Sequence, residues 1–157
     1  MGDVYLSREG YEKLREELEL LKTVRRREIS RAIGEARAHG DLSENAEYDA
    51  AKDAQAHNEK RVFELEQTLS HARILEDENI TADQVLIGAT VRLQDLDSGE
   101  EFDYTFVSEE EADFGQNKIS ITSPVGSGLL GHKENESVEI KVPAGILRYK
   151  VIKISRR

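Results

Sequence analysis

The chain has 157 residues, no cysteine and a formal net charge of −10 at pH 7. The lack of cysteine excludes disulfides and thiolate metal sites. Both halves of the sequence are net acidic, whereas general nucleic-acid binding requires a net basic surface, so neither half is expected to bind nucleic acid by itself. No apolar run is long enough to span a bilayer, and the first residues, MGDVYLSREG, lack a signal-peptide core. We therefore expect a cytoplasmic protein with no membrane partner.

Two long helices are predicted in the first half, over residues 8–38 and 45–76. Both segments are rich in Glu, Leu, Arg, Lys and Ala and contain no proline. Their apolar residues recur at the three- and four-residue steps of a heptad seam, with two consecutive four-residue steps around Arg25 that indicate a stutter. When the chain is folded back at 41–42, paired positions keep a constant register, with Arg25 opposite Asn58. The segments therefore predict an antiparallel helical hairpin with arms of roughly 45 Å.

The predicted seam contains mostly apolar and small side chains. Its members are Tyr11, Leu14, Leu18, Leu21, Arg25, Ile29, Ala32 and Ala36 in the first segment and Tyr48, Ala51, Gln55, Asn58, Val62, Leu65, Leu69 and Ala72 in the second. The alternative is an ordinary helical bundle. A bundle requires a second apolar face on each helix, whereas the remaining faces here are mostly charged.

The second half has a different pattern, with both prolines, most of the glycines and short alternating runs that predict strands. The runs are Thr90–Gln94, Phe102–Val107, Lys118–Thr122, Ser137–Val142 and Leu147–Ile154. In the segment DSGE, Gly99 supplies the left-handed backbone of a hairpin turn. Ser123 and Pro124 are expected to cap and begin one short helix.

These patterns predict an α+β protein with two domains. Residues 1–77 form the antiparallel coiled coil, residues 78–83 a linker, and residues 84–157 a small, mostly antiparallel sheet with one short helix.

The predicted bend between the helices is strongly acidic, and residues 39–53 read HGDLSENAEYDAAKD. Gly40 is expected to end the first helix, and Asp41 or Ser43 to cap the second, with Asp41 and Glu44 spaced as in a capping box. Helix capping by itself accounts for Asp41 and Glu44, so it remains open that these acids have a purely structural role. The acidic run continues beyond the caps, however, and a long hairpin that carries carboxylates at its tip favours function.

The carboxylates of Asp41 and Glu44 are ligands that suit Mg²⁺. Two acids on a solvated bend form an incomplete site, because they lack a third ligand and a pocket that excludes water. We therefore expect them to complete a metal site that another protein has already built, as in two-metal phosphodiester chemistry.

Four stretches together resemble the bacterial Gre transcript-cleavage factors of the GreA type, over nearly the whole chain. They are VYLSREGYEKLREELE, ARAHGDLSENAEYDAAKD, ISITSPVGSGLLG and VEIKVPAGILRYKVIKI. The chain departs from the family pattern at Ser127, where we expect a basic residue in relatives.

The resemblance implies that the coiled coil inserts into the secondary channel of bacterial RNA polymerase, while an FKBP-like C-terminal domain docks on the polymerase. Asp41 and Glu44 would help to hold a catalytic Mg²⁺ only jointly with the polymerase active site, and Ser43 and Asn45 would contact the reacting groups. The protein would thereby stimulate polymerase to cleave the 3′ end of nascent RNA in backtracked, arrested complexes. It would be no enzyme by itself, would hold Mg²⁺ weakly when free, and would be a monomer.

A basic run lies midway along the first helix. In view of the resemblance, its side chains are expected to contact the RNA 3′ segment or the channel wall; the members are Arg25, Arg26, Arg27 and Arg31. Charge balance with nearby Glu28 and Glu35 is the alternative. Of the other candidates, His39 is expected to cap a helix and Tyr48 to pack in the seam.

Three other functions remain open at this point. A Gre-like inhibitor would block the channel with the same hairpin, although it would be expected to pack four acids into the turn rather than the pair Asp41 and Glu44. A prolyl isomerase or chaperone would require an exposed aromatic pocket from among Phe102, Tyr104, Phe106 and Phe114. A scaffold would pair the coiled coil with a partner helix.

Overall fold

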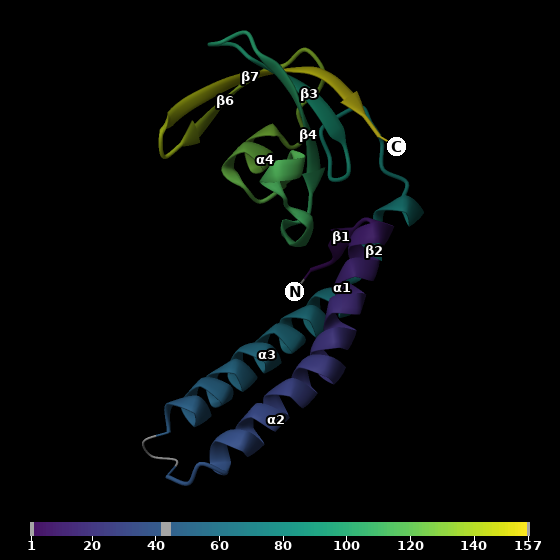
Figure 1. Cartoon of the computed structure of the whole chain (residues 1–157). Helices are drawn as coiled ribbons and strands as arrows, with labels where there is room; N and C mark the ends of the chain where they lie inside the picture. The colour runs from purple at the N-terminus through teal and green to yellow at the C-terminus, as the bar shows by residue number, and fades with distance from the viewer. Residues whose placement is uncertain (1, 42–44, 157) are drawn as a thin grey trace. The chain divides into compact units, whose positions relative to one another are not determined.

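The computed structural model describes residues 2–41 and 45–156 (Figure 1). The chain divides into two compact units, of which the first contains Glu9–Ala72. The second unit contains Arg73–Arg157 together with Val4–Arg8. The first strand of the protein therefore belongs with the C-terminal unit, although it precedes the first helix in the sequence.

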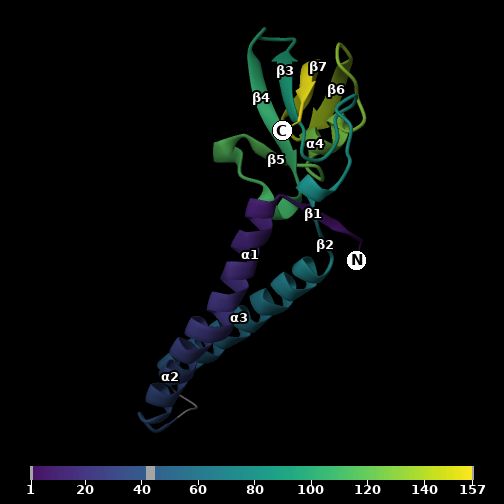
Figure 2. The ribbon, with the colours of Figure 1, turned by 90° about the vertical axis from the view of Figure 1, so that its right-hand side faces the viewer.

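The first unit contains the predicted helical hairpin (Figure 1). Its first arm is α1 (Arg8–Leu20), a π-helix (Leu21–Arg25) and α2 (Arg26–Arg37), and its second arm is α3 (Ala46–Ser70). Near the tip, α2 and α3 enclose a small core of Ile29, Ile33 and Ala51, with Tyr48 and Ala54 packed against it. Figure 2 shows α1 diverging from α3 farther from the tip. The hairpin and the packing role of Tyr48 are confirmed, and the closest packing is at the tip end.

The π-helix lies where the sequence indicates a stutter. A π turn holds one residue more than an α turn, so it absorbs the extra residue of an interrupted heptad pattern. The seam residue after Ile29 is consequently Ile33, which is 8% exposed, whereas Ala32 is exposed. The prediction of Ala32 is wrong because the heptad pattern shows where the repeat is interrupted, but not how many residues the turn there adds.

A polar layer crosses the hairpin at the π-helix. Asn58 is 4% exposed, and its Nδ2 donates to the Leu21 carbonyl oxygen at 3.2 Å. Arg26 donates two hydrogen bonds to Glu59, at 3.0 and 2.7 Å, and Arg61 donates two to Glu17, at 2.9 and 3.1 Å. A single buried asparagine in a helical seam specifies register, because any shift would leave its amide unpaired.

Arg25 was expected to face Asn58, and both residues do line one groove of the hairpin. The buried amide nevertheless bonds to the backbone of the π-helix, while the Arg25 guanidinium is exposed and lies 3.9 Å from Glu28. The partner of Asn58 is thus a backbone carbonyl group. Pairing side chains along the two predicted seams could not reveal such a partner.

The second helix ends earlier than predicted. Residues Ala72–Ile74 form strand β2, which pairs with β1 (Val4–Leu6) in a two-stranded sheet. Leu6 is fully buried. The expected helix through residue 76 is wrong because pairing with a distant strand outweighs local helix propensity at these residues.

A five-stranded sheet forms the second unit, in the order β5-β4-β3-β7-β6 (Figure 2). The strands are β3 (Thr90–Asp95), β4 (Glu101–Val107), β5 (Lys118–Ser120), β6 (Ser137–Val142) and β7 (Gly145–Ser155). Neighbours are antiparallel except β4 and β5, which are parallel. The α+β class and the mostly antiparallel sheet are therefore confirmed.

The core of this unit lies between one face of the sheet and the short helix α4 (Pro124–Leu129). Fully buried side chains from β3, β4, β7 and α4 meet there, namely Val91, Leu93, Phe106, Val151 and Leu129. As expected, Ser123 caps α4, since its Oγ accepts from the Gly126 amide at 3.0 Å, and Pro124 begins it.

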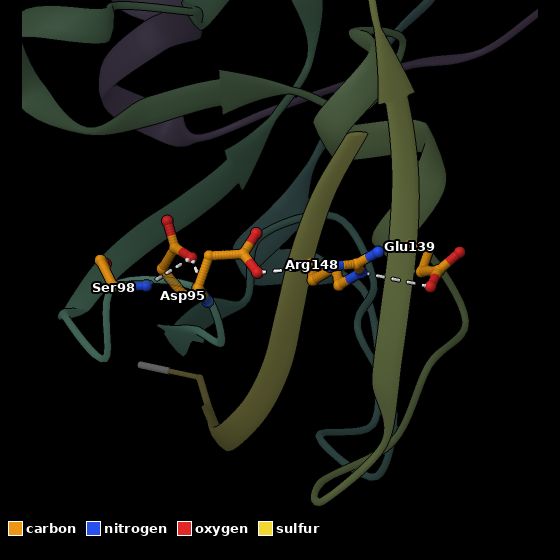
Figure 3. A network of polar contacts seen from close by, with 5 residues as sticks. Asp95, Ser98, Glu139 and Arg148 are labelled. Atoms are coloured by element: carbon orange, nitrogen blue, oxygen red, sulfur yellow. Dashed lines mark hydrogen bonds and ion pairs between the residues drawn. The ribbon is translucent and has the colours of Figure 1, made fainter. Parts of the chain in front are cut away.

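A network of polar contacts joins the β3–β4 turn to strands β7 and β6 (Figure 3). Asp95 Oδ1 accepts from the amides of Asp97 and Ser98, at 2.8 and 3.3 Å, and so closes the β3–β4 turn. Arg148 donates to Asp97 and to Glu139, each at 3.4 Å. Gly99 has φ of 80°, as expected for this turn.

Replacing Asn58 by Ala is expected to lower the free energy of unfolding by about 1–3 kcal/mol, because the Leu21 carbonyl group loses its side-chain partner. Urea unfolding followed by circular dichroism at 222 nm measures the change. His57→Ala, one position away on the exposed face of α3, is the matched control and should change stability little.

The same glycine-to-alanine change is expected to have opposite effects at two positions. A Cβ on Gly126 would overlap the Ser120 carbonyl oxygen, so Gly126→Ala should destabilise the second unit by about 2–3 kcal/mol. Gly34, inside α2, has open space around it, so Gly34→Ala should stabilise the hairpin by about 0.5–1 kcal/mol. Thermal unfolding of both variants checks the signs, and equal effects would contradict the packing described for α4.

Candidate functional site

The candidate site is the tip of the hairpin, where α2 ends and α3 begins. The last turn of α2 closes with bonds from the His39 amide to the Ala36 carbonyl and from the Gly40 amide to the Arg37 carbonyl, both at 3.2 Å. Gly40 has φ of 100°, a conformation that glycine adopts without a steric penalty. Gly40 therefore turns the chain toward Asp41, but the expected cap at Gly40 is wrong, because α2 ends at Arg37 and its C-cap is Ala38.

Asn45 is the residue that begins α3. Its Oδ1 accepts from the Tyr48 amide at 3.1 Å, and its Nδ2 donates to the Ala36 carbonyl oxygen at 2.6 Å. The expected cap by Asp41 or Ser43 is wrong, because the helix begins only at Ala46. Asparagine is one of the preferred N-cap residues, so the sequence did contain this signal.

Acidic residues occupy the first turn of α3, where the helix dipole favours them, and these are Glu47 and Asp49. His39 Nε2 lies 3.2 Å from Glu47 Oε2, which joins the two helix ends across the tip. The expected helix cap at His39 is therefore wrong. His39 contacts a side chain of the other helix, and the C-cap of α2 is Ala38. The Arg37 guanidinium lies 6.0 Å from the centre of the Tyr48 ring.

Of the two predicted catalytic acids, Asp41 lies exposed next to Gly40 at the end of α2. Glu44 and Ser43 lie outside the described residues. An exposed carboxylate at the tip fits the donor chemistry that Mg²⁺ prefers. Within residues 2–41 and 45–156, no three His, Asp or Glu side chains are grouped so that they could hold a metal ion.

The four arginines of the basic run have different surroundings. Arg26 is paired with Glu59 across the hairpin, and this hydrogen-bonded pairing raises the pKa of Arg26 and lowers that of Glu59. Arg27 and Arg31, four residues apart on α2, are exposed on one face of the helix. Arg27 Nε donates to the Thr23 carbonyl at 3.4 Å. The charge partner of Arg26 was missed because Glu59 is distant in sequence.

The aromatic residues of the second unit divide between core and surface. Phe106 is fully buried, whereas Phe114 is 76% exposed. Phe102 and Tyr104 are partly buried, with ring centres 5.0 Å apart, and burial raises the pKa of the Tyr104 hydroxyl. As the alternating pattern implies, some of these rings are core residues.

Family comparison covers both units. The family described as "Transcription elongation factor, N-terminal" matches residues 4–74, and "Transcription elongation factor, GreA/GreB, C-term" matches residues 80–156. The chain belongs to the GreA/GreB family of transcription elongation factors. It is thus a Gre-type elongation factor, and a factor of this family acts with RNA polymerase.

Relatives match nearly end to end. A protein called transcription elongation factor GreA from Chloroherpeton thalassium is 54% identical, over 96% of this chain and 95% of the relative. GreA from Prosthecochloris aestuarii is 49% identical over 96% of each chain, and GreA from Thermotoga neapolitana is 48% identical over the full length of both.

In the described residues of this GreA/GreB family member, no helix is both long enough and apolar enough to cross a membrane.

The Arg26–Glu59 pair is expected to be pH dependent. Because the folded-state pKa of Glu59 is lowered, the pair stabilises the fold above the ordinary glutamate pKa of about 4.3, and this contribution is lost as the pH falls through the lower, folded-state pKa. A double-mutant cycle with Arg26→Ala and Glu59→Ala, measured by urea unfolding at neutral and acidic pH, should show a coupling energy at neutral pH that vanishes in acid. An unchanged coupling energy would contradict the assignment.

Proposed function

We propose that this Gre-type factor rescues backtracked, arrested RNA polymerase by stimulating the polymerase's own cleavage of the nascent RNA 3′ end. Family membership supports action on transcription elongation. The observation that carries the cleavage proposal is the exposed carboxylate of Asp41, at the end of two helices that are packed and tied together beside it. Such a tip can deliver carboxylates into a site on another protein.

In this proposal, Asp41 and Glu44 supply carboxylate ligands and do no chemistry alone. Their carboxylates would help to hold Mg²⁺ jointly with the polymerase, where the metal would supply Lewis-acid chemistry for hydrolysis of the phosphodiester. The hairpin contributes reach and orientation, since the register set at Asn58 and the tie at Asn45 limit movement of the arms. The protein is therefore a cofactor of polymerase and not an enzyme on its own.

The basic run has separable roles in this proposal. Arg27 and Arg31 project from one exposed face of α2 and are available to bind the RNA 3′ segment or the channel wall. Arg25 is also exposed, but it lies near Glu28. Arg26 mainly stabilises the hairpin through Glu59. We further propose that Ser43 contacts the reacting groups.

The C-terminal unit is proposed to dock on polymerase while the hairpin enters the secondary channel. In this division the C-terminal unit binds polymerase and the hairpin delivers the tip. Altering the tip should therefore leave binding to polymerase intact. We propose that the free protein is a monomer, and we place it in the cytoplasm, where bacterial RNA polymerase works.

Asp41→Ala and Glu44→Ala are each expected to abolish stimulated RNA cleavage while leaving polymerase binding almost unchanged, since the docking surfaces remain intact. The assay uses arrested elongation complexes made with purified bacterial polymerase, and it follows shortening of 3′-backtracked RNA with time. Binding is measured separately by competition with labelled wild-type factor.

Asp49→Asn is the matched control, because it removes an acid of the tip from the first turn of α3 and not from the bend. This variant should retain cleavage. Normal cleavage by Asp41→Ala or Glu44→Ala would refute the proposed role of the tip. Inhibition of intrinsic cleavage by the wild-type chain would instead identify a channel-blocking inhibitor.

A further inference from the structure

Asn45 joins the two helices on either side of the acidic bend. Its side-chain amide donates to the Ala36 carbonyl in the last turn of α2, and its side-chain oxygen accepts from the Tyr48 amide in the first turn of α3. We call these three residues the tip clasp. One planar group thus holds a backbone atom of each helix.

The clasp is anchored in the packed part of the hairpin. Ala36 is 1% exposed, and Tyr48 packs against the core of Ile29, Ile33 and Ala51. The Ala36 carbonyl also accepts from the His39 amide at 3.2 Å, so the clasp meets the turn that leads to Asp41. Both ends of the bend are consequently fixed to a rigid base.

A second contact across the tip, between His39 and Glu47, is weaker. His39 and Glu47 lie 3.2 Å apart, but their side chains are 62% and 72% exposed. An exposed ion pair is screened by water and salt and costs side-chain entropy, so it contributes little. A partly buried hydrogen bond of 2.6 Å is less screened, and it is therefore the interaction that sets the spacing of the helix ends.

We propose that Asn45 is a positioning residue for the cleavage that this factor stimulates. It holds the helix ends on either side of the bend at a fixed separation, and it thereby fixes the base from which the carboxylate of Asp41 is presented to the metal. This inference rests on the proposed function, and it replaces the expected contact between Asn45 and the reacting groups. Hydrogen-bond partners that orient metal ligands commonly alter metal affinity about tenfold or more when they are replaced, and we expect an effect of this size from a residue that fixes the backbone on either side of the bend.

Asn45→Ser separates the two bonds of the clasp. Serine caps a helix about as well as asparagine, so the bond to Tyr48 can be retained. Its side chain is too short to reproduce the bond to Ala36, so the link between the helices is lost. Ala50→Ser, an exposed substitution in the same helix, is the matched control for the presence of serine.

Two measurements test the proposal with the full-length chain. In the free protein, hydrogen exchange by NMR at the amides of His39 and Gly40 should accelerate several-fold in Asn45→Ser and stay unchanged in Ala50→Ser. With arrested polymerase, the Mg²⁺ concentration for half-maximal stimulated cleavage should rise about tenfold in Asn45→Ser. The factor concentration for half-maximal cleavage should not change, because docking does not involve the clasp.

Unchanged exchange in free Asn45→Ser would overturn the proposal, since a residue that only contacts the reacting groups would give that result. An unchanged Mg²⁺ requirement would also overturn it, since a merely structural bond would give that result. If the wild-type chain stimulates no cleavage, the proposed function itself fails. That outcome is seen without any variant, so the two failures are distinguishable.

Discussion

The register of the hairpin depends on the hydrogen bond that the buried Asn58 makes in a seam with little core. Two packed helices have no third layer, so few side chains determine how far one arm slides along the other. Asn58 is buried among them and satisfies its amide through the Leu21 carbonyl of the π-helix. Sliding the arms would leave this polar group unpaired at a cost of about 1–3 kcal/mol. The register of α2 against α3 follows from that contact.

The π-helix and the buried amide are complementary. A π turn interrupts the regular i to i+4 bonds of a helix and leaves a carbonyl group poorly paired or displaced. Asn58 donates to the carbonyl of Leu21, the first residue of the π-helix. Along the first arm, the ion pairs Arg61–Glu17 and Arg26–Glu59 lie before and after the π-helix. The exposed ion pairs add modest energy, whereas the buried amide adds specificity. Together they place the small core of the tip.

A second side-chain amide links the two arms at the tip of the hairpin. At Asn45, as at Asn58, a side-chain amide from α3 binds a backbone carbonyl of the first arm. The two bonds hold the hairpin at both ends of its closely packed part. A tip that carries carboxylates to another protein requires such rigidity, because each freely moving group would lose entropy on binding.

Much of this protein could be predicted from its sequence, because helix and strand patterns are local. The heptad spacing predicts the hairpin, the alternation predicts the five strands, and the acidic bend HGDLSEN together with the resemblance predicts the Gre family. These signals need only nearby residues and a repeating geometry. The stutter around Arg25 likewise marks the position of the π-helix.

Other features were decided by tertiary structure, because they join residues that are distant in sequence. The pairing of Val4–Leu6 with Ala72–Ile74 ends α3 early, and the length of the π turn selects Ile33 over Ala32 as the buried residue. The role of Asn45 was also hidden, since its partner, the Ala36 carbonyl, is a backbone atom that has no side-chain signature. The sequence by itself determined the two arms of the hairpin, the five strands of the larger sheet and where the acids lie. Only the tertiary structure decided which backbone groups meet, because those contacts exist only after the chain has folded back on itself.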